Sequence, residues 1–161
     1  MFRVSSLFAF VLVAALAVLA SSAVGAASSP TSKAAKIAGA QAYVAAVVSH
    51  SEKDINSIPM ADNITRFENL NGSPLSQTAN GSVSLKKSLR YGTTAFFVAG
   101  SAGPGNYTVL KNGTVSSVYR LKAGLLGIPF TETQVFELFD YTKSGLIYNI
   151  TAYAVAPPPK A

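Results

Sequence analysis

The sequence predicts an α+β domain in which helices come first and a curved antiparallel sheet follows. Two observations support this class. Apolar residues recur at helical spacing ahead of the middle of the chain, whereas the second half consists of short strand-like segments separated by Gly, Asn and Pro turns. Helices that precede a run of strands, rather than alternating with them, are typical of α+β proteins. The chain has 161 residues, which fits one domain, and it contains no internal repeat.

The helical part is predicted to begin with a long helix over residues 33–49. Thr31 or Ser32 can cap it, because a hydroxyl oxygen accepts a hydrogen bond from a free amide of the first turn. Ser51 and Asp54 resemble a capping box and predict a second, brief helix. The apolar stripe of the long helix consists of Ile37, Ala40, Val44, Val47 and Val48.

Strands are expected to follow these helices. Residues 63–69 favour a first strand, and residues 70–81 favour a polar loop rich in Gly, Pro and Asn. A short helix capped by Ser82 is expected to run to about residue 90. Residues 93–99 then favour a strand, and residues 100–105 a glycine-rich turn.

Two hairpins complete the predicted sheet of four or five strands. The pair Asn112-Gly113 is a strong hairpin signal between strands at 107–111 and 114–122. Residues 123–130 are expected to form an apolar loop before a last hairpin, whose strands are 133–139 and 146–155. One face of the strand at 114–122 is expected to carry Val115, Ser117, Tyr119 and Leu121.

The first 25 residues have the composition of a secretory signal peptide. Nineteen of them are apolar, and a run of 14 apolar residues at 7–20 follows Arg3. This run is shorter than the roughly 17–25 residues that span a bilayer, so cleavage after Ala23, Gly25 or Ala26 is favoured over a membrane anchor. The expected organisation is a signal peptide (1–25), a linker (26–32), the domain (33–156) and a Pro-rich tail (157–161), in a protein that is secreted and not membrane-bound.

Composition excludes several kinds of site. The chain has no cysteine and one histidine, His50, so disulfides and the usual zinc sites are not expected. The formal net charge is +6, but the basic residues are scattered apart from Lys86, Lys87 and Arg90. Nucleic-acid modules repeat basic and aromatic residues along one surface, a pattern that this chain lacks. No metal, no cofactor and no nucleic-acid partner are therefore predicted.

Six of the eight asparagines lie in the Asn-X-Ser/Thr glycosylation pattern, where chance predicts about 1.5 from the Ser and Thr content. Together with a signal peptide, this excess predicts a secreted glycoprotein. The alternative is that Asn-Gly-Ser/Thr forms good turns without sugar. The six candidates are Asn63, Asn71, Asn80, Asn106, Asn112 and Asn149.

A resemblance to a known superfamily rests on residues 42–69. This segment holds Tyr43 on the first helix, His50 with Asp54 near the helix end, Pro59 in the link, and Glu68-Asn69 at the end of a strand. The pattern resembles the nuclear transport factor 2-like, or SnoaL-like, superfamily, in particular its small secreted members. The resemblance extends over about residues 33–155.

The resemblance implies a cone, in which a bent sheet wraps around helices and encloses an apolar cavity open at one end. Members include ketosteroid isomerase, scytalone dehydratase, epoxide hydrolases and polyketide cyclases, and many others only bind ligands or partners. Members often dimerise through the outer face of the sheet. A homodimer is thus an open expectation, because glycans at Asn106 or Asn149 would cover that face.

Candidate site residues follow from strand alternation. If Asn63 carries a glycan it must face outward, and Arg66 and Glu68 then face the cavity. Such a pair could orient an anionic or carbonyl ligand, with Glu68 as the candidate base. Chemistry of this type needs a carboxylate whose pKa is raised by an apolar pocket. The opposite phase, which buries Phe67, stays open as the alternative.

The same reasoning at Asn149 turns Tyr148 inward, either as a hydrogen-bond donor in the cavity or as an ordinary core tyrosine. Tyr43 either borders the cavity or packs in the core. Glu137 alternates with apolar neighbours and is expected to face solvent. The candidate catalytic residues are therefore Glu68 and Tyr148, and the candidate ligand-binding residues are Tyr43, Arg66, Glu68 and Tyr148.

Three functions remain open at this point. The leading expectation is a secreted, N-glycosylated domain that binds a small apolar ligand in its cavity. A second is an isomerase, cyclase or hydrolase that acts on a cyclic carbonyl or epoxide compound. A third is a secreted interaction protein whose cavity is filled by side chains such as Phe96, Phe97 and Phe136.

Overall fold

The computed structural model describes residues 31–92, 98–101, 103–125 and 128–155. The predicted signal peptide, most of the predicted linker and the Pro-rich tail lie outside these residues. No helix in the described part of the chain is long and apolar enough to cross a membrane. The elements are α1 (Lys33–Ser49), α2 (Glu52–Ser57), β1 (Met60–Leu70), β2 (Ser76–Asn80), α3 (Ser82–Tyr91), β3 (Val98–Ser101), β4 (Asn106–Val109), β5 (Val115–Leu125), β6 (Ile128–Tyr141) and β7 (Ile147–Val155).

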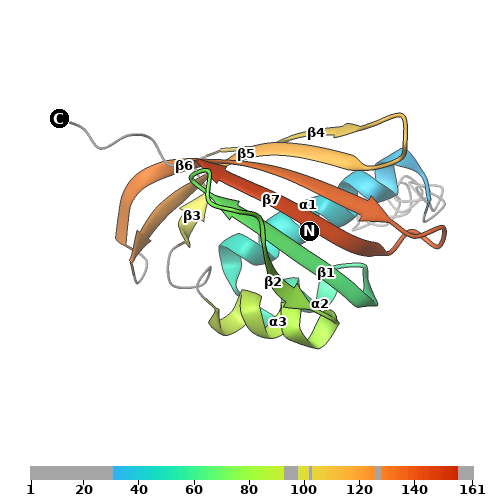
Figure 1. The fold of residues 1–161 in the computed structure, drawn as a ribbon, viewed down its shortest axis with the longest axis horizontal. Coiled ribbons are helices and arrows are strands. Elements are labelled where there is room, and N and C mark those ends of the chain that lie inside the picture. Colours follow the sequence, from blue (N-terminus) through green and yellow to red (C-terminus); the bar gives the residue numbers. More distant parts are fainter. Residues whose placement is uncertain (1–30, 93–97, 102, 126–127, 156–161) are drawn as a thin grey trace, which may run out of the picture.

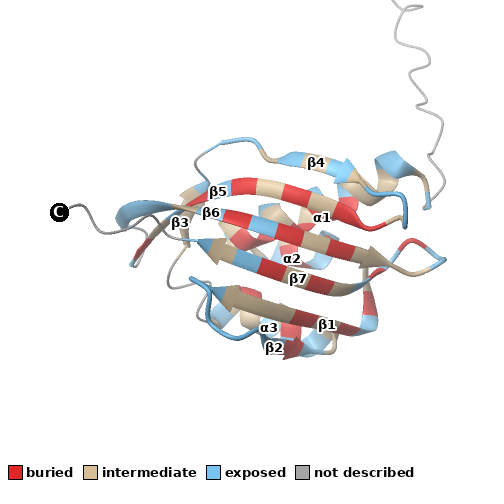
Figure 2. Ribbon diagram, turned by 45° about the horizontal axis from the view of Figure 1, so that its top comes forward, coloured by how far each residue is buried: buried red, intermediate tan, exposed pale blue. Residues whose placement is uncertain are grey.

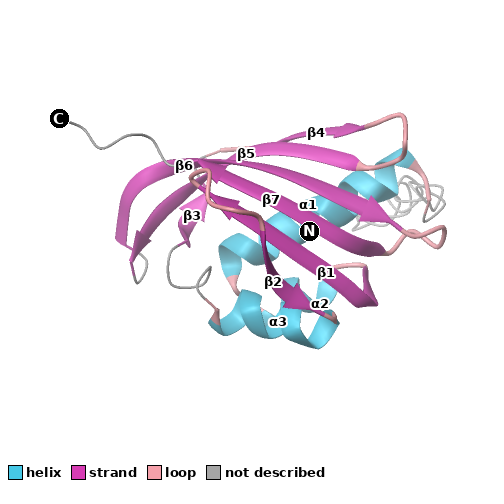
Figure 3. Cartoon of the chain, in the orientation of Figure 1, coloured by secondary structure: helices cyan, strands magenta, loops and turns pink. Residues whose placement is uncertain are grey.

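The seven described strands form one curved sheet, with the helices packed on one of its faces (Figure 1 and Figure 3). The strand order is β2-β1-β7-β6-β5-β3, and β4 pairs with another part of β5. All pairs are antiparallel except β1 and β7, which are parallel. The predicted α+β class is confirmed. The expected count of four or five strands is too low, because the described sheet has seven; one of them, the short edge strand β2, lies in the segment 70–81 that was expected to be a loop.

Local capping explains where two of the helices begin. Ser32 Oγ accepts a hydrogen bond from the Ala35 amide at 3.1 Å, and α1 has the predicted bounds. Ser51 Oγ accepts from the Asp54 amide at 3.2 Å and starts α2 as predicted. The predicted cap of α3 is wrong: Gly81, with φ of 87°, occupies the cap position and Ser82 is already helical.

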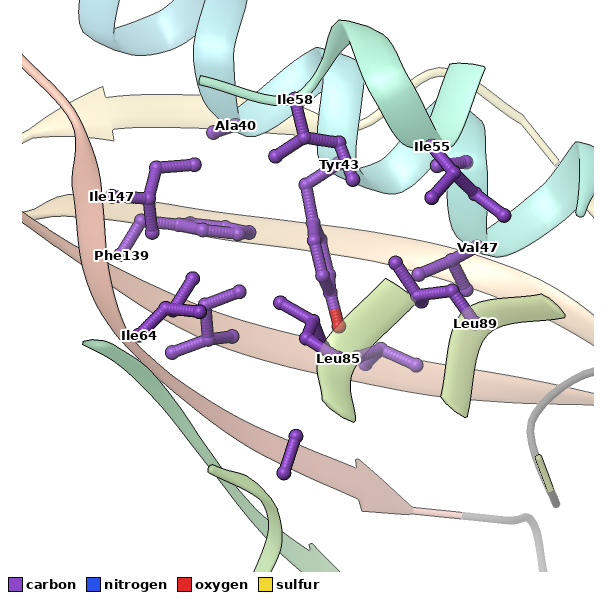
Figure 4. Packing of buried hydrophobic residues seen from close by; sticks show 14 of the residues in the cluster. Ala40, Tyr43, Val47, Ile55, Ile58, Ile64, Leu85, Leu89, Phe139 and Ile147 are labelled. Atoms are coloured by element: carbon purple, nitrogen blue, oxygen red, sulfur yellow. The ribbon is translucent and has the colours of Figure 1, made fainter. Parts of the chain in front are cut away.

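The core lies between α1 and the concave face of the sheet. Figure 2 shows the buried residues as bands that alternate along β5, β6 and β7, as expected for strands with one covered face. Tyr43 from α1 points into this layer and meets Phe139 of β6 edge to face, with ring centroids 5.4 Å apart (Figure 4). Ile64, Leu85 and Ile147 bring β1, α3 and β7 into the same cluster.

The hairpin of β5 and β6 is longer than predicted. Residues 123–130 were expected to form a loop, but β5 runs to Leu125 and β6 starts at Ile128. Gly124 permits this close pairing, because a Cβ atom there would lie 1.9 Å from the Ile128 carbonyl oxygen. Of the strand predicted at 93–99, residues 93–97 lie outside the described residues, and β3 begins at Val98.

Candidate functional site

A cavity of about 310 Å³ lies between α1 and the concave face of the sheet. Its wall is mostly apolar, and one group of polar side chains interrupts it. Pockets of this size are at the lower end of those that hold drug-sized ligands. The lining residues are Val47, Arg66, Glu68, Leu70, Asn71, Val98, Tyr119, Leu121, Ala123, Thr133, Val135, Glu137, Ala152 and Ala154.

Burial distinguishes the floor of the cavity from its mouth. Arg66, Tyr119 and Glu137 are at most 4% exposed and form the floor. Leu70 and Asn71 are exposed and mark the mouth, where β1 ends. The polar chemistry of the site therefore lies deep, beneath an apolar entrance.

Strand β1 supplies the first polar pair. Arg66 donates from Nη2 to Glu68 Oε1, and their side chains are 3% and 18% exposed. The predicted inward orientation of these two side chains is confirmed, because both line the cavity, whereas Asn63 is exposed. The alternative orientation of the strand, with Phe67 in the interior, is wrong. The reason is that Arg66 is covered by the Tyr43 ring, whose centroid lies 5.8 Å from the guanidinium carbon.

Strands β5 and β6 supply the second polar pair. The Tyr119 hydroxyl donates to Glu137 Oε2 at 2.8 Å, and Glu137 is 1% exposed. Burial raises the pKa of Glu137 to about 7, although Arg66 and the Tyr119 hydrogen bond act in the opposite direction. Burial also raises the pKa of Tyr119 well above its ordinary value, and the Glu137 carboxylate adds to this shift.

The expectation that Glu137 faces solvent is wrong. Phe136 occupies the outer face instead, where its ring contacts Tyr153 with centroids 6.0 Å apart. The sequence contained a signal for this orientation. Val135 and Phe139 are both two positions from Glu137, so all three side chains share one face of the strand. Both apolar residues are buried. Reading these two residues as the inward set would have placed Glu137 in the interior.

Tyr43 lies beneath the cavity and is not among its lining residues. The side chain is fully buried, and its hydroxyl lies near Arg66 without a hydrogen bond of good geometry to any described residue. Burial is the main reason why the pKa of Tyr43 is raised. Tyr43 therefore belongs to the core, which was the alternative to its predicted place at the cavity border.

Arg66 remains a cation in this setting. Burial alone would lower its pKa, but the neighbouring Tyr43, Glu68 and Glu137 raise it above the ordinary arginine value. While Glu137 holds its proton, the Arg66–Glu68 ion pair leaves the floor of the cavity close to neutral. It becomes negative when Glu137 releases its proton.

Tyr148 does not point into the cavity. It is 43% exposed, so the predicted inward orientation is wrong. The cause is an irregular register in β7: Asp140 pairs with Asn149 while Tyr141 pairs with Ile147, which leaves Tyr148 unpaired in a bulge. Ile147 and Ile150 both face the core across this bulge.

Asn149 is tied into a polar chain across the sheet. Its side-chain amide accepts from Thr65 Oγ1 at 2.9 Å and donates to Asp140 Oδ2 at 3.0 Å. Thr114 Oγ1 donates to the other Asp140 oxygen at 2.6 Å. Asn149 is partly buried, whereas the other five asparagines of the glycosylation pattern are exposed, namely Asn63, Asn71, Asn80, Asn106 and Asn112.

The remaining candidate residues have structural contacts. His50 ends α1 with φ of 54°, and its Nδ1 lies 3.1 Å from the Leu89 carbonyl oxygen. Within the described residues, no group of three His, Cys, Asp or Glu side chains is placed to hold a metal ion. Phe136 lies on the outer face, and Phe96 and Phe97 lie outside the described residues.

Comparisons with known proteins show the fold. No protein-family model and no curated protein matches the chain. It is similar to the structure of an NTF2-like protein from Anabaena variabilis, with 16% identity and a TM-score of 0.56 over 79% of this chain and 91% of that one.

Two further structures have the same architecture. A SnoaL-like family protein from Agrobacterium tumefaciens, named for an expected isomerase activity, is 17% identical with a TM-score of 0.53, over 74% of this chain and 96% of that one. A Bacillus subtilis protein, also named for an expected isomerase activity, is 14% identical with a TM-score of 0.53, over 74% and 88%. The chain therefore has the nuclear transport factor 2-like fold that the resemblance implied.

Proposed function

We propose that this chain binds a small, mainly apolar molecule that carries an uncharged oxygen function. The observation that supports this most strongly is the cavity of about 310 Å³, with its apolar wall and its deep polar floor. An apolar wall contributes affinity through burial, while a few convergent polar groups set the orientation of the ligand. Domains with the nuclear transport factor 2-like fold often bind ligands, which is consistent with this function.

The charges of the floor favour an uncharged ligand. The Arg66 cation is already paired with Glu68, and burial favours the neutral form of Glu137 up to about pH 7. A ligand carboxylate would add a negative charge beside these two carboxyl groups, which costs free energy in a buried site. A ketone, ester or hydroxyl can share a hydrogen bond with Glu137 at a smaller cost.

The binding can be tested with prodan, a neutral naphthalene ketone whose emission shifts to the blue in apolar surroundings. We expect saturable one-to-one binding that is lost in Ala152→Phe, because Ala152 is buried and lines the cavity. Ala45→Phe adds the same ring on an exposed face of α1 and serves as the matched control. Equal prodan binding by the two variants would refute binding in the cavity.

A second candidate function is proton transfer next to a carbonyl group, for which Glu137 is the specific observation. A general base is most effective when its pKa lies near the working pH, and that of Glu137 is about 7. The names of the Agrobacterium and Bacillus proteins, which refer to isomerases, also favour this class. Glu68 is engaged in an ion pair, so Glu137 is the better candidate base, and the exposed Tyr148 drops out as a donor.

This second function has a test that needs no known substrate. Deuterium uptake by a panel of small cyclic ketones in heavy water, followed by NMR, reports proton abstraction directly. Glu137→Gln should abolish any uptake that the native protein catalyses, while Glu132→Gln, at an exposed side chain, should not change it. Catalysis that survives in Glu137→Gln would eliminate Glu137 as the base.

We further propose that the protein is secreted and glycosylated at its exposed sequence motifs. Exposure of five of the six asparagines supports this, and the hydrogen-bonded amide of Asn149 makes that position the least accessible. Glycopeptide mapping of protein from the medium of a eukaryotic host is the test. Two or more occupied asparagines among the five would support the proposal, and medium protein without glycans would contradict it.

A further inference from the structure

Two carboxyl groups flank a single small residue on the concave face of the sheet. Glu68 of β1 and Glu137 of β6 both pair with Ala152 of β7, the strand that lies between them (Figure 2). All three residues line the cavity. Neighbouring strands are about 4.8 Å apart, so the main chains that carry the two carboxyl groups are about 10 Å apart. Because Ala152 has only a methyl group, one ligand can reach both carboxyl groups.

Each of these carboxyl groups has one oxygen engaged and one oxygen free. Glu68 Oε1 accepts a hydrogen bond from Arg66 Nη2, and Glu137 Oε2 accepts from the Tyr119 hydroxyl at 2.8 Å. Glu68 Oε2 and Glu137 Oε1 have no hydrogen-bond partner among the described residues. These two oxygens are therefore the polar atoms that the pair offers to a ligand.

Glu137 is the hydrogen-bond donor of the cavity floor. Arg66 uses Nη2 for Glu68, and its Nε and Nη1 are buried outside the reach of the cavity space. The Tyr119 hydroxyl has a single proton, which it donates to Glu137. Because Oε2 of Glu137 accepts this proton, the acid proton of Glu137 lies on Oε1, the free oxygen.

The two free oxygens differ in what they offer. Glu137 Oε1 donates while the acid is neutral, whereas Glu68 Oε2 belongs to the carboxylate of an ion pair and only accepts. A ligand that satisfies both needs an acceptor oxygen toward β6 and an O–H group toward β1. A hydroxy ketone, with its two oxygens a few bonds apart, has this combination.

We propose that the cavity selects an apolar hydroxy ketone, whose carbonyl oxygen accepts from Glu137 and whose hydroxyl group donates to Glu68. This inference rests on the proposed binding function and adds the chemical class of the ligand. A plain ketone would cover Glu68 Oε2 without giving it a partner, and a plain alcohol would do the same to the Glu137 proton. Leaving a covered polar group unpaired costs free energy, so a site of this kind discriminates against both.

The test compares three probes that share one naphthalene body: methyl 2-naphthyl ketone, 1-(2-naphthyl)ethanol and 2-hydroxy-1-(2-naphthyl)ethanone. Their affinities for the full chain are measured by isothermal titration calorimetry at pH 6. The hydroxy ketone should bind about tenfold more tightly than either of the others, because its second hydrogen bond is made to a charged group. Equal affinities of the hydroxy ketone and the plain ketone would overturn the inference and leave the proposed function intact. No binding of any probe would contradict both.

A conservative variant tests the hydrogen bond to β1. In Glu68→Gln the side-chain carbonyl can still accept from Arg66, but the free end becomes an amide donor. The hydroxy ketone should then bind no better than the plain ketone, whose own affinity should change much less. Glu132→Gln, at a half-exposed side chain, is the matched control and should keep the native order of affinities. A hydroxy ketone that keeps its full advantage in Glu68→Gln would overturn the inference.

The dependence on pH tests the hydrogen bond to β6. Charged and titratable side chains act on Glu137 from α1, β1, β4 and β5, namely Tyr43, Arg66, Glu68, Tyr107 and Tyr119. Burial raises the pKa values of the three tyrosines, so they stay neutral between pH 6 and pH 8.5, whereas Glu137, with a pKa of about 7, loses its proton.

The native protein should therefore bind the plain ketone about tenfold more weakly at pH 8.5 than at pH 6, because the donor on Oε1 is lost. In Glu137→Gln the amide carbonyl can accept from Tyr119 while the amide N–H donates to the ligand at either pH. This variant should bind the ketone equally at both pH values. Ketone binding by the native protein that does not change with pH would overturn the inference.

Discussion

A single carboxyl group, that of Glu137, largely determines the chemistry of the cavity. It is buried opposite Ser117 in the β5–β6 register and accepts a hydrogen bond from Tyr119. An acid in such surroundings retains its proton to higher pH than the same acid in the unfolded chain. The protonation state of the cavity floor should therefore change close to neutral pH.

The pH dependence of stability tests this directly. Between its ordinary pKa of 4.5 and its folded value of about 7, Glu137 holds a proton in the folded protein that the unfolded chain has released. Its contribution to the free energy of unfolding is therefore largest at low pH and falls as pH rises through this window, by up to about 3 kcal/mol. Glu137→Gln should remove this slope, so the difference in stability between native protein and variant should change with pH from 4.5 to 8.

Chemical unfolding at several pH values provides the measurement. Glu132→Gln, at a half-exposed side chain, is the control and should follow the native curve. Parallel curves for native protein and Glu137→Gln would contradict the raised pKa of Glu137.

Tyr43 gives a second prediction at the residue scale. Its buried hydroxyl has no good hydrogen bond to the described residues, whereas its ring packs on Phe139 and Arg66. Tyr43→Phe should change the free energy of unfolding by no more than about 1 kcal/mol, or stabilise the fold, because it removes an unsatisfied polar group. Tyr43→Ala should cost about 3–5 kcal/mol through lost packing. A loss above 2 kcal/mol in Tyr43→Phe, measured by denaturant unfolding, would show that the hydroxyl has a partner.

At the scale of elements, the β5–β6 hairpin depends on one glycine. Gly124→Ala would bring a Cβ atom to 1.9 Å from the Ile128 carbonyl oxygen, so the backbone must move. We expect a loss of about 1–3 kcal/mol in thermal or chemical unfolding. Gly103→Ala, where a Cβ atom meets no described atom within 4 Å, should be close to neutral. Equal stability of the two variants would contradict the close pairing at Gly124.

The elements with local signals could be predicted from the sequence. The long helix α1 and its Ser32 cap, the α2 cap at Ser51 and the hairpin at Asn112-Gly113 all depend on neighbouring residues. The inward phase of Arg66 and Glu68 also followed from alternation along one strand.

Features that depend on distant pairing could not be predicted in the same way. The bulge that turns Tyr148 outward arises from the pairing of β7 with both β1 and β6. Strand β2 has one buried residue, Ala79, and forms only because β1 offers it an edge. Glu137 was missed for a different reason: the phase of β6 was assigned from Phe136 and Leu138, whereas Val135 and Phe139 are the buried pair.

On the scale of the whole molecule, the bent sheet and α1 form one container with a polar floor and an apolar entrance. The parallel pairing of β1 with β7 brings the Arg66–Glu68 pair next to the strands that carry Tyr119 and Glu137. These four residues come from three strands, of which β1 is far from the β5–β6 hairpin in the sequence. Because the sheet topology brings the Arg66–Glu68 pair to the Tyr119–Glu137 pair, it determines the candidate function as much as any single residue does.

The most direct test of ligand binding in this container is a methyl NMR titration of the full chain with prodan. The methyl groups of Val47, Leu121 and Val135 line the cavity and should shift together and saturate at one equivalent. Those of Val83 and Leu146, which lie outside the cavity lining, should not move. Shifts confined to exposed residues outside the cavity lining, such as Leu125, Ile128 and Val155, or no shifts at all, would contradict the claim that the cavity is the ligand site.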